Sequence, residues 1–485
     1  MVFPSALFLF LFLPITLAGY FLVRAKSRNM FLLVMSLLFY SWGGPIYIFL
    51  LLGSIFLNYV SGLLIHFSRR NQHVALTGKT VLIASIAANL ALLFYFKYTN
   101  FFFNNVNDIL QYVHVAPVMF PNVSLPIGIS FITFQAMTYV IDIYRQKAEA
   151  PLNPLNCALY VALFPKIVNG PIVQYHDIAK QIASRAITRQ LCSSGIQRFI
   201  FGLSKKIIIA NTLGEVADKI FAVPVQEVTS GMAWLGIVCY TLQIYFDFSG
   251  YSDMAIGLGR MLGFEFLENF NFPYISQSIR EFWRRWHISL SNWFRDYLYI
   301  PLGGNRKSFL RTYLNLWVVF FLCGLWHGAK WNFIIWGALH GSYLVIERLG
   351  WDQYLNKLWR PIRHGYALLL VIIGWVFFRA ETLTQAVQYL ASMFGFTNAT
   401  GIKYYALFYC DPKTVLTLLI GCIIAMPIAS GIGQRLQSAI ENSGFKKGGQ
   451  LLLDLGHYGL LAFLFCLSVS YLAAGTYNSF IYFRF

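Results

Sequence analysis

Cys323-Gly324-Leu325-Trp326-His327-Gly328 sets a histidine in a long apolar segment and so indicates what kind of protein this chain forms. Between Arg311 and Glu347 the only charged side chain is Lys330. If the segment is helical from Arg311 onward, a rise of about 1.5 Å per residue carries His327 roughly 24 Å from that arginine, well inside a bilayer. The segment therefore predicts a membrane-spanning helix with an imidazole deep in the apolar layer.

A polar side chain at that depth costs free energy unless it is paired or takes part in function. One interpretation of His327 is a neutral imidazole bonded to a backbone carbonyl. Gly324 and Gly328 favour a second interpretation, because glycines four residues apart leave the helix surface beside the histidine bare. A substrate or another backbone can then come close, and we expect His327 to be a reactive residue.

The composition of the whole chain supports the membrane class. Of its 485 residues, 58% are hydrophobic and only 12% are charged, which excludes a soluble globule with an ordinary polar surface. The net charge of +18 comes from short basic clusters between apolar runs, as membrane orientation requires, and does not indicate nucleic-acid binding. The seven cysteines are scattered, so we expect no disulfide framework and no metal site. A tightly bound cofactor is not expected either.

These features predict an all-α polytopic integral membrane protein with a single domain over residues 1–485. The first apolar stretch, about 5–23, has no basic residue before it and is followed by Arg24, Lys26 and Arg28. Positive residues favour the cytoplasmic side, so we expect the amino terminus outside and the stretch to be an anchor, not a cleaved signal peptide. Further spans are expected near residues 29–42, 46–66, 80–98, 125–144, 313–326, 331–347, 364–380, 414–432 and 455–474.

Two regions between these spans are harder to interpret. Residues 155–173 are short and broken by Pro165, Gly170 and Pro171, so they fit a re-entrant piece lining a cavity or a loop at the interface. Residues 199–221 are interrupted by charged side chains. That region fits a span or a surface helix.

Asp247 and Asp253 are the acidic residues of the otherwise apolar stretch 230–263. Ser249-Gly250 can break a helix between them, and aspartates beside a break can cap the freed backbone groups. The alternative is a polar wall of a substrate cavity.

Residues 280–300 predict an amphipathic helix along the inner interface or over a cavity mouth. Aromatic and apolar residues recur there at three- and four-residue spacing, at Phe282, Trp283, Trp286, His287, Leu290, Trp293, Phe294 and Tyr297. Pro301 and Gly303-Gly304 are expected to end the helix. His287 lies on the aromatic face, where a catalytic role and core packing are both open.

At this point the motifs resemble a known family. Phe282-Trp283-Arg284-Arg285-Trp286-His287-Ile288-Ser289, with Leu325-Trp326-His327-Gly328 further on, resembles the paired-histidine signature of the membrane-bound O-acyltransferase (MBOAT) family. The stretches 243–253, 269–274 and 374–380 are similar to its AlgI-like branch of bacterial alginate O-acetyltransferases. The DltB D-alanyl transferases are a more distant match.

The resemblance implies an MBOAT fold with roughly 10–12 spans, plus re-entrant and interfacial helices, around a central cavity. Its signature core covers about residues 120–380. It also implies an enzyme of the bacterial cytoplasmic membrane that takes an acyl group from a cytoplasmic thioester and delivers it to a hydroxyl or an extracytoplasmic transferase. His327 matches the essential catalytic histidine, and His287 lies near it in the motif. A neutral imidazole that removes a hydroxyl proton typically contributes about 10²–10⁴-fold, so we expect His327 to be the general base.

Acetyl-CoA is the expected donor, with an acylated carrier protein as the alternative. The phosphates of acetyl-CoA would be attracted by basic residues on the inner face, namely Arg280, Arg284, Arg285, Arg295, Arg306 and Lys307. Positive-inside bias predicts the same cluster without any donor. The candidate cavity or donor-binding residues are Trp283, Arg284, Arg285, Trp286, Asp247, Asp253, Asn271 and Trp326.

The carboxyl terminus, Phe480-Ile481-Tyr482-Phe483-Arg484-Phe485, is aromatic and is expected outside. Such a tail fits an interfacial belt. It also resembles the ending of a small membrane partner in D-alanylation systems. If the tail folds into an outer cavity, the Tyr482 phenol is a possible acyl relay near His327.

The resemblance favours an acetyltransferase subunit that works with an extracytoplasmic SGNH-type acetyltransferase on an alginate-like exopolysaccharide or a cell-wall polymer. A D-alanyl transferase of the teichoic acid type is the alternative. A transporter is disfavoured, because no inverted repeat is evident and transport leaves the glycine-flanked His327 unexplained.

Overall fold

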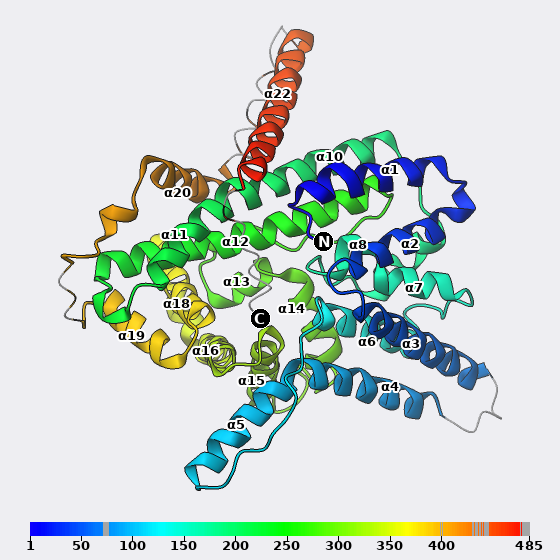
Figure 1. Ribbon diagram of the computed structural model, residues 1–485, viewed down its shortest axis with the longest axis horizontal. Helices are drawn as coiled ribbons and strands as arrows, with labels where there is room; N and C mark the ends of the chain where they lie inside the picture. The colour runs from blue at the N-terminus through cyan, green and yellow to red at the C-terminus, as the bar shows by residue number, and fades with distance from the viewer. Residues whose placement is uncertain are drawn as a thin grey trace. The chain divides into compact units, whose positions relative to one another are not determined.

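The computed structural model describes residues 1–485 except 71–76, 398, 400, 429–430, 432–434, 436–437, 439, 441–445, 476 and 478–485. Every regular element of these residues is a helix, which confirms the all-α class (Figure 1). Contacts divide the chain into two compact units. The first contains Met1–Ile196, Ala255–Leu267 and Gly328–Lys330, and the second contains Gln197–Met254, Glu268–His327 and Trp331–Phe485.

Several helices are long and apolar enough to cross a membrane. In the described part of the chain, five qualify by length and composition: Tyr47–Ser68, Gly78–Tyr112, Phe309–His327, Arg360–Arg379 and Gly448–Ala473. Shorter apolar helices are Phe8–Leu22, Ile129–Tyr144 and Pro412–Ile424. The helices therefore support a multi-pass membrane protein, as the composition predicts. The span number of roughly 10–12 and the outside position of the amino terminus stay predictions.

The first unit is built around α6 (Ile129–Tyr144), which is buried from Ile129 to Ile143. A helix that is apolar on all sides needs neighbours on all sides. The neighbours of α6 are α3 (Tyr47–Arg70), α4 (Gly78–Leu93), α7 (Pro154–Ala162) and α9 (Tyr175–Ala183). The other α-helices that lie wholly in this unit are α1 (Leu13–Leu22), α2 (Arg28–Ser41), α5 (Thr99–Tyr112) and α8 (Phe164–Ile167).

The broken stretch 155–173 forms α7, α8 and an irregular segment, none of which is long enough to cross a membrane. Residues 164–175 are all buried. Lys166, with no exposed surface, donates a hydrogen bond to the side chain of Gln135 in α6. Burial inside the protein fits the re-entrant interpretation better than an interfacial loop.

α12 (Ser230–Met261) runs without interruption through Ser249-Gly250, so the predicted break there is wrong. A Cβ on Gly250 would lie 2.7 Å from the carbonyl oxygen of Gly202 in α10 (Arg189–Ser204). Gly250 therefore allows two helices to pack closely and does not end one. Residues 199–221, which the sequence left as either a span or a surface helix, form the end of α10, a π-helical turn at Lys205–Ala210 and α11 (Asn211–Phe221). They are mostly buried, which argues against a surface helix.

Residues 280–300 do not form the one amphipathic helix that was expected. They form α13 (Ile279–Arg285), α14 (Ile288–Phe294) and a π-helical turn at Arg295–Tyr299. The chain breaks at His287, whose φ of 44° lies in the left-handed region. A hydrogen bond to a segment distant in sequence holds this break. The amide of Ile288 donates to the carbonyl of Asn269, which lies in an irregular segment, at 2.9 Å.

In the second unit, α13 contacts α16 and α18. The remaining helices of this unit are α15 (Phe309–His327), α16 (Trp331–Ile346), α17 (Asp352–Leu355), α18 (Arg360–Arg379), α19 (Leu383–Met393), α20 (Pro412–Ile424) and α22 (Lys446–Ala473). α15 and α16 lie side by side along their lengths (Figure 1).

Candidate active site

Two glycines determine how closely α15 and α16 approach each other. A Cβ on Gly324 would lie 2.3 Å from the carbonyl oxygen of Phe333, and a Cβ on Gly337 would lie 2.3 Å from that of Phe320. The two backbones are therefore in contact. The sequence left open whether Gly324 allows a substrate or another backbone to come close. In this helix pair it allows the backbone of α16 to come close.

His327 is the last residue of α15 and is 6% exposed. Its ring contacts Trp326, Trp336 and Phe378, with ring centroids 5.0, 5.0 and 5.2 Å apart. Edge-to-face contacts of this kind fix a ring in place. The imidazole is thus held in an apolar aromatic cluster, where water competes little for its nitrogens.

His287 joins the same aromatic cluster. It has no exposed surface. Its ring centroid lies 6.1 Å from that of Trp326 and 4.6 Å from that of Phe248 in α12. The fold therefore brings both predicted histidines into contact with the indole ring of Trp326. The sequence does not require this contact, because the two histidines are far apart along the chain.

Asn269 is the hydrogen-bonding partner of His287 and was not predicted as a site residue. Its side-chain oxygen lies 3.2 Å from Nδ1 of His287 and accepts hydrogen bonds from Ser289. Its side-chain nitrogen donates to Ser252 of α12 at 3.1 Å. A buried asparagine with a histidine partner indicates a ring of defined orientation.

A third buried histidine, His340 of α16, was also missed. It has no exposed surface, and its Nδ1 accepts a hydrogen bond from Nε1 of Trp283 at 3.2 Å. Its ring centroid lies 4.9 Å from that of Trp336, which also contacts His327. The signal was present in the sequence, because His340 is a histidine in an apolar helix, as His327 is.

A cavity of about 520 Å³ opens beside this cluster in the second unit. Its charged lining consists of Arg280, Arg284, Arg295 and Arg348. Apolar residues of α13, α14 and α15, Trp283 among them, form much of the remaining wall, together with polar residues such as Ser291, Asn292 and Asn305. The cavity reaches Cys323. Residues four apart on a helix lie on the same face, so Cys323 is one turn from His327.

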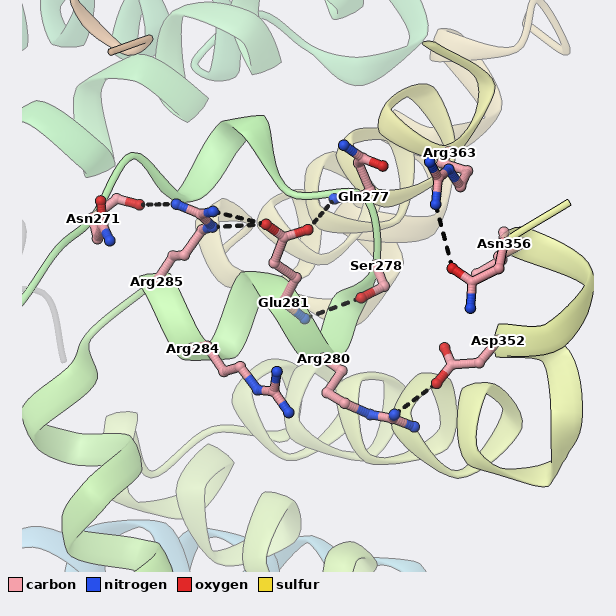
Figure 2. A pocket seen from close by; sticks show the side chains of 11 residues that line it. Asn271, Gln277, Ser278, Arg280, Glu281, Arg284, Arg285, Asp352, Asn356 and Arg363 are labelled. Atoms are coloured by element: carbon pink, nitrogen blue, oxygen red, sulfur yellow. Dashed lines mark hydrogen bonds and ion pairs between the residues drawn. The ribbon is translucent and has the colours of Figure 1, made fainter. Parts of the chain in front are cut away.

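A second, polar pocket shares Arg280 and Arg284 with this cavity (Figure 2). Arg280 pairs with Asp352 at 2.6 Å, and Arg285 pairs with Glu281 at 2.9 Å. Among the described residues Arg284 makes no hydrogen bond or ion pair, and it is exposed. Of the two predicted arginines, Arg285 is thus held by the protein, while Arg284 has a guanidinium available to an anion.

Asp247 and Asp253 are in ion pairs with α10 and the π-helical turn after it. Asp247 pairs with the fully buried Lys206. Asp253 pairs with Arg198 and with Lys205, each at 2.7 Å. Because α12 is continuous, the capping role proposed for these aspartates is wrong, and charge pairing between two helices takes its place. A role as a cavity wall stays a prediction.

The other predicted site residues fall into different environments. Trp286 and Trp326 are buried, at 3% and 4% exposure, and Trp286 packs on Trp375 of α18. Asn271 is exposed and lines the polar pocket. Tyr482 lies outside the described residues. Within the described chain, no His, Cys, Asp and Glu side chains gather in a group that could hold a metal ion.

Buried imidazoles in an apolar cluster beside a basic cavity are suited to moving a proton during transfer of an acyl group. Together with the helical membrane fold, they define a polytopic membrane acyltransferase. Residues 72–358 match the model of the membrane-bound O-acyltransferase family, and the chain belongs to this family. The resemblance seen in the sequence is therefore confirmed.

Relatives of known name agree with this assignment. The chain is 48% identical over 397 residues to the probable alginate O-acetylase AlgI of Pseudomonas putida, covering 82% of this chain and 81% of that protein. It is 37% identical over 436 residues to the peptidoglycan O-acetyltransferase of Helicobacter pylori, covering 82% and 81%. The teichoic acid D-alanyltransferase of Bacillus subtilis is 30% identical over 267 residues, which cover 52% of this chain and 66% of that protein.

Proposed function

We propose that this chain is an O-acetyltransferase subunit that passes an acetyl group across the membrane to an extracytoplasmic polysaccharide. The relatives named for O-acetylation align with 82% of the chain, whereas the D-alanyltransferase aligns with 52%, which favours acetate. The observation that carries the proposal is the shared contact of His287 and His327 with Trp326, beside an arginine-lined cavity.

The donor in this proposal is acetyl-CoA, bound in the arginine-lined cavity. A volume of about 520 Å³ lies within the usual range of about 300–1,000 Å³ for small-molecule sites. The exposed guanidinium of Arg284 suits a phosphate group, and the apolar wall near Cys323 suits the thioester end. An acylated carrier protein would present the same thioester to the same cavity.

His327 acts as the general base in the proposed reaction. The acceptor hydroxyl oxygen attacks the thioester carbonyl carbon while His327 takes the hydroxyl proton. The carbon–sulfur bond then breaks, its electron pair leaves with the sulfur, and the proton passes from His327 to the thiolate. The products are an acetyl ester and a free thiol, so His327 returns to its neutral state.

The acceptor side needs a partner, because the polymer lies outside the cell. We propose an SGNH-type acetyltransferase on the outer face of the bacterial cytoplasmic membrane, where the amino terminus of this chain also lies. The polymer is an alginate-like exopolysaccharide or a cell-wall polymer. Only the acetyl group then has to cross the membrane, through a cavity reached from both faces.

Mass spectrometry of the purified protein with its transferase partner, after incubation with isotope-labelled acetyl-CoA, tests the proposal. We expect labelled acetyl esters on an acceptor hydroxyl, and their loss in His327→Ala. A complex that stays unlabelled with acetyl-CoA but accepts D-alanine from a charged carrier protein would contradict the proposal and favour the D-alanyl transferase.

A further inference from the structure

The side-chain amide of Asn269 has only one orientation that fits its neighbours. One of its terminal atoms lies 3.1 Å from the backbone nitrogen of Ser289 and 2.9 Å from the hydroxyl of the same serine. A backbone N–H can only donate, so this atom is the carbonyl oxygen Oδ1. The same oxygen lies 3.2 Å from Nδ1 of His287, so that ring nitrogen must carry a hydrogen.

This hydrogen fixes the chemistry of the other ring nitrogen. A neutral imidazole carries one N–H, so Nε2 of His287 holds a lone pair and can only accept. Nε2 is buried and has no hydrogen-bond partner among the described residues. Burial lowers the pKa of His287 to about 3, and no carboxylate or cation of the described chain contributes to that shift. The ring therefore stays neutral at physiological pH.

Asn269 also holds the backbone on which the ring is mounted. His287 has a φ of 44°, a left-handed conformation that non-glycine residues adopt only at a cost in free energy. Around it, the amide of Ile288 donates to the carbonyl of Asn269 and the amide of Asn271 donates to the carbonyl of Arg285, each at 2.9 Å. Asn269 is itself 1% exposed and is anchored to Ser252. The ring of His287 is thus fixed in both position and tautomer.

We propose that Asn269 is a positioning residue that locks His287 in the Nδ1–H tautomer and so presents Nε2 to bound substrate as a hydrogen-bond acceptor. The inference deepens the proposed function and rests on it. Nε2 then accepts a hydrogen bond from the substrate, either from an amide N–H of the pantetheine arm that carries the thioester or from a hydroxyl of the acceptor beside the one that reacts. It does not stabilise the oxyanion of the transition state, which requires a donor.

Kinetics of acetyl transfer from labelled acetyl-CoA in membrane vesicles tests this role. Asn269→Ala should lower kcat/KM by at least about tenfold, because a ring that is no longer held in place loses its hydrogen bond to the substrate, and a hydrogen bond lost from a buried site costs roughly tenfold. A raised KM for acetyl-CoA identifies an amide N–H of the pantetheine arm as the donor group, and a lowered kcat at unchanged KM identifies the acceptor hydroxyl. An Asn269→Ala enzyme with wild-type kcat/KM would overturn the inference.

Asn269→Asp separates positioning from a structural role. It keeps the acceptor for Nδ1–H, so most activity should remain, but its carboxylate raises the pKa of His287. The acid limb of the pH–rate profile should therefore move to higher pH, because a protonated ring has lost its acceptor. Asn89→Asp is the matched control, since Asn89 is 2% exposed and donates to Asn58 at 2.8 Å, and its profile should keep the wild-type position. An unmoved limb in Asn269→Asp, or an equal shift in Asn89→Asp, would refute the inference.

The tautomer of His287 can be measured without an activity assay. Solid-state NMR of ¹⁵N-histidine-labelled protein in lipid, with His287→Asn to identify the signal, should show a protonated Nδ1 and an unprotonated Nε2 for His287. The reverse tautomer would overturn the inference. A wild-type protein that transfers no acetyl from acetyl-CoA would instead count against the proposed function, and the NMR result would still decide the tautomer.

Discussion

The arginines around the basic cavity differ in whether an acidic residue of the protein already pairs with them. Arg280 and Arg285 are in ion pairs with Asp352 and Glu281. Arg284 lines both pockets and has no such partner in the described chain. A guanidinium whose donors are unoccupied binds an anion without first breaking a contact. We therefore expect Arg284, and not the whole basic cluster, to recognise the donor.

Arg284→Gln should raise the KM for acetyl-CoA by about tenfold or more with little change in kcat, because a hydrogen bond to a charged group contributes about 1.5–3 kcal/mol. Steady-state kinetics in membrane vesicles measures this change. Arg311→Gln, the same substitution at an exposed residue of α15, should leave KM unchanged. An equal rise in both variants would mean that general surface charge, not Arg284, attracts the donor.

The Tyr482 phenol is the residue predicted to relay the acyl group. Tyr482→Phe keeps the aromatic ring and removes only the hydroxyl that an acyl group would need. If the phenol accepts the acetyl group on its way to the outer face, the variant should produce almost no acetylated polymer while the protein remains in the membrane. Polymer acetylation at the wild-type level, measured by mass spectrometry of released acetate, would dispose of the relay.

The two histidines were the part of the site that the sequence could predict. His327 is isolated in an apolar run and His287 lies on the aromatic face of an amphipathic segment, and the structure brings both to Trp326. His340 satisfied the same criterion and was overlooked. Asn269 had no such signal, because its importance comes from a turn that places it beside His287. Tertiary contacts of this kind have no periodicity to detect.

The crossing of α15 and α16 is the element on which the position of His327 depends. Gly324→Ala would place a Cβ 2.3 Å from a backbone oxygen of α16, and a backbone cannot move aside as a flexible side chain can. We expect a loss of about 1–3 kcal/mol of stability and a lower melting temperature in detergent. Activity should fall with it, because the helix end that carries His327 shifts.

Gly365→Ala in α18 is the matched control for this prediction. A Cβ there meets nothing within 4 Å, so the substitution should be neutral or slightly stabilising, as alanine is the better helix former. Thermal unfolding followed by circular dichroism compares the two variants. Equal melting temperatures for Gly324→Ala and the wild type would show that the helix crossing tolerates a side chain.

Sequence patterns predicted elements well where one helix is long and apolar, and less well where helices are short or charged. The apolar run ending at His327 is α15, as expected. The aromatic periodicity of 280–300 is real, yet hydrogen bonds to Asn269 divide that stretch at His287. In α12 the glycine that suggested a break instead allows a close helix contact at Gly202. In both cases a partner distant in sequence decided the local structure.

For the whole molecule, composition was sufficient to predict a membrane protein, and the long apolar runs predicted that it is helical. An 18% aromatic, 58% hydrophobic chain has too little polar surface for an ordinary soluble globule. Its grouping into two compact units was not foreseen, because segments such as Ala255–Leu267 join a unit formed mainly by the first 196 residues. Long-range grouping of this kind depends on side-chain packing, which composition does not encode.

The claim that joins the site to the membrane fold is that His327, although buried in the bilayer-spanning part of the chain, performs the acyl transfer. The direct test is the amount of O-acetylated polymer made by cells whose only copy carries His327→Ala, with membrane abundance checked by immunoblot. We predict a stably inserted protein and no acetylated polymer, with a partial loss in His287→Ala. Wild-type acetylation by the His327→Ala protein would contradict the account.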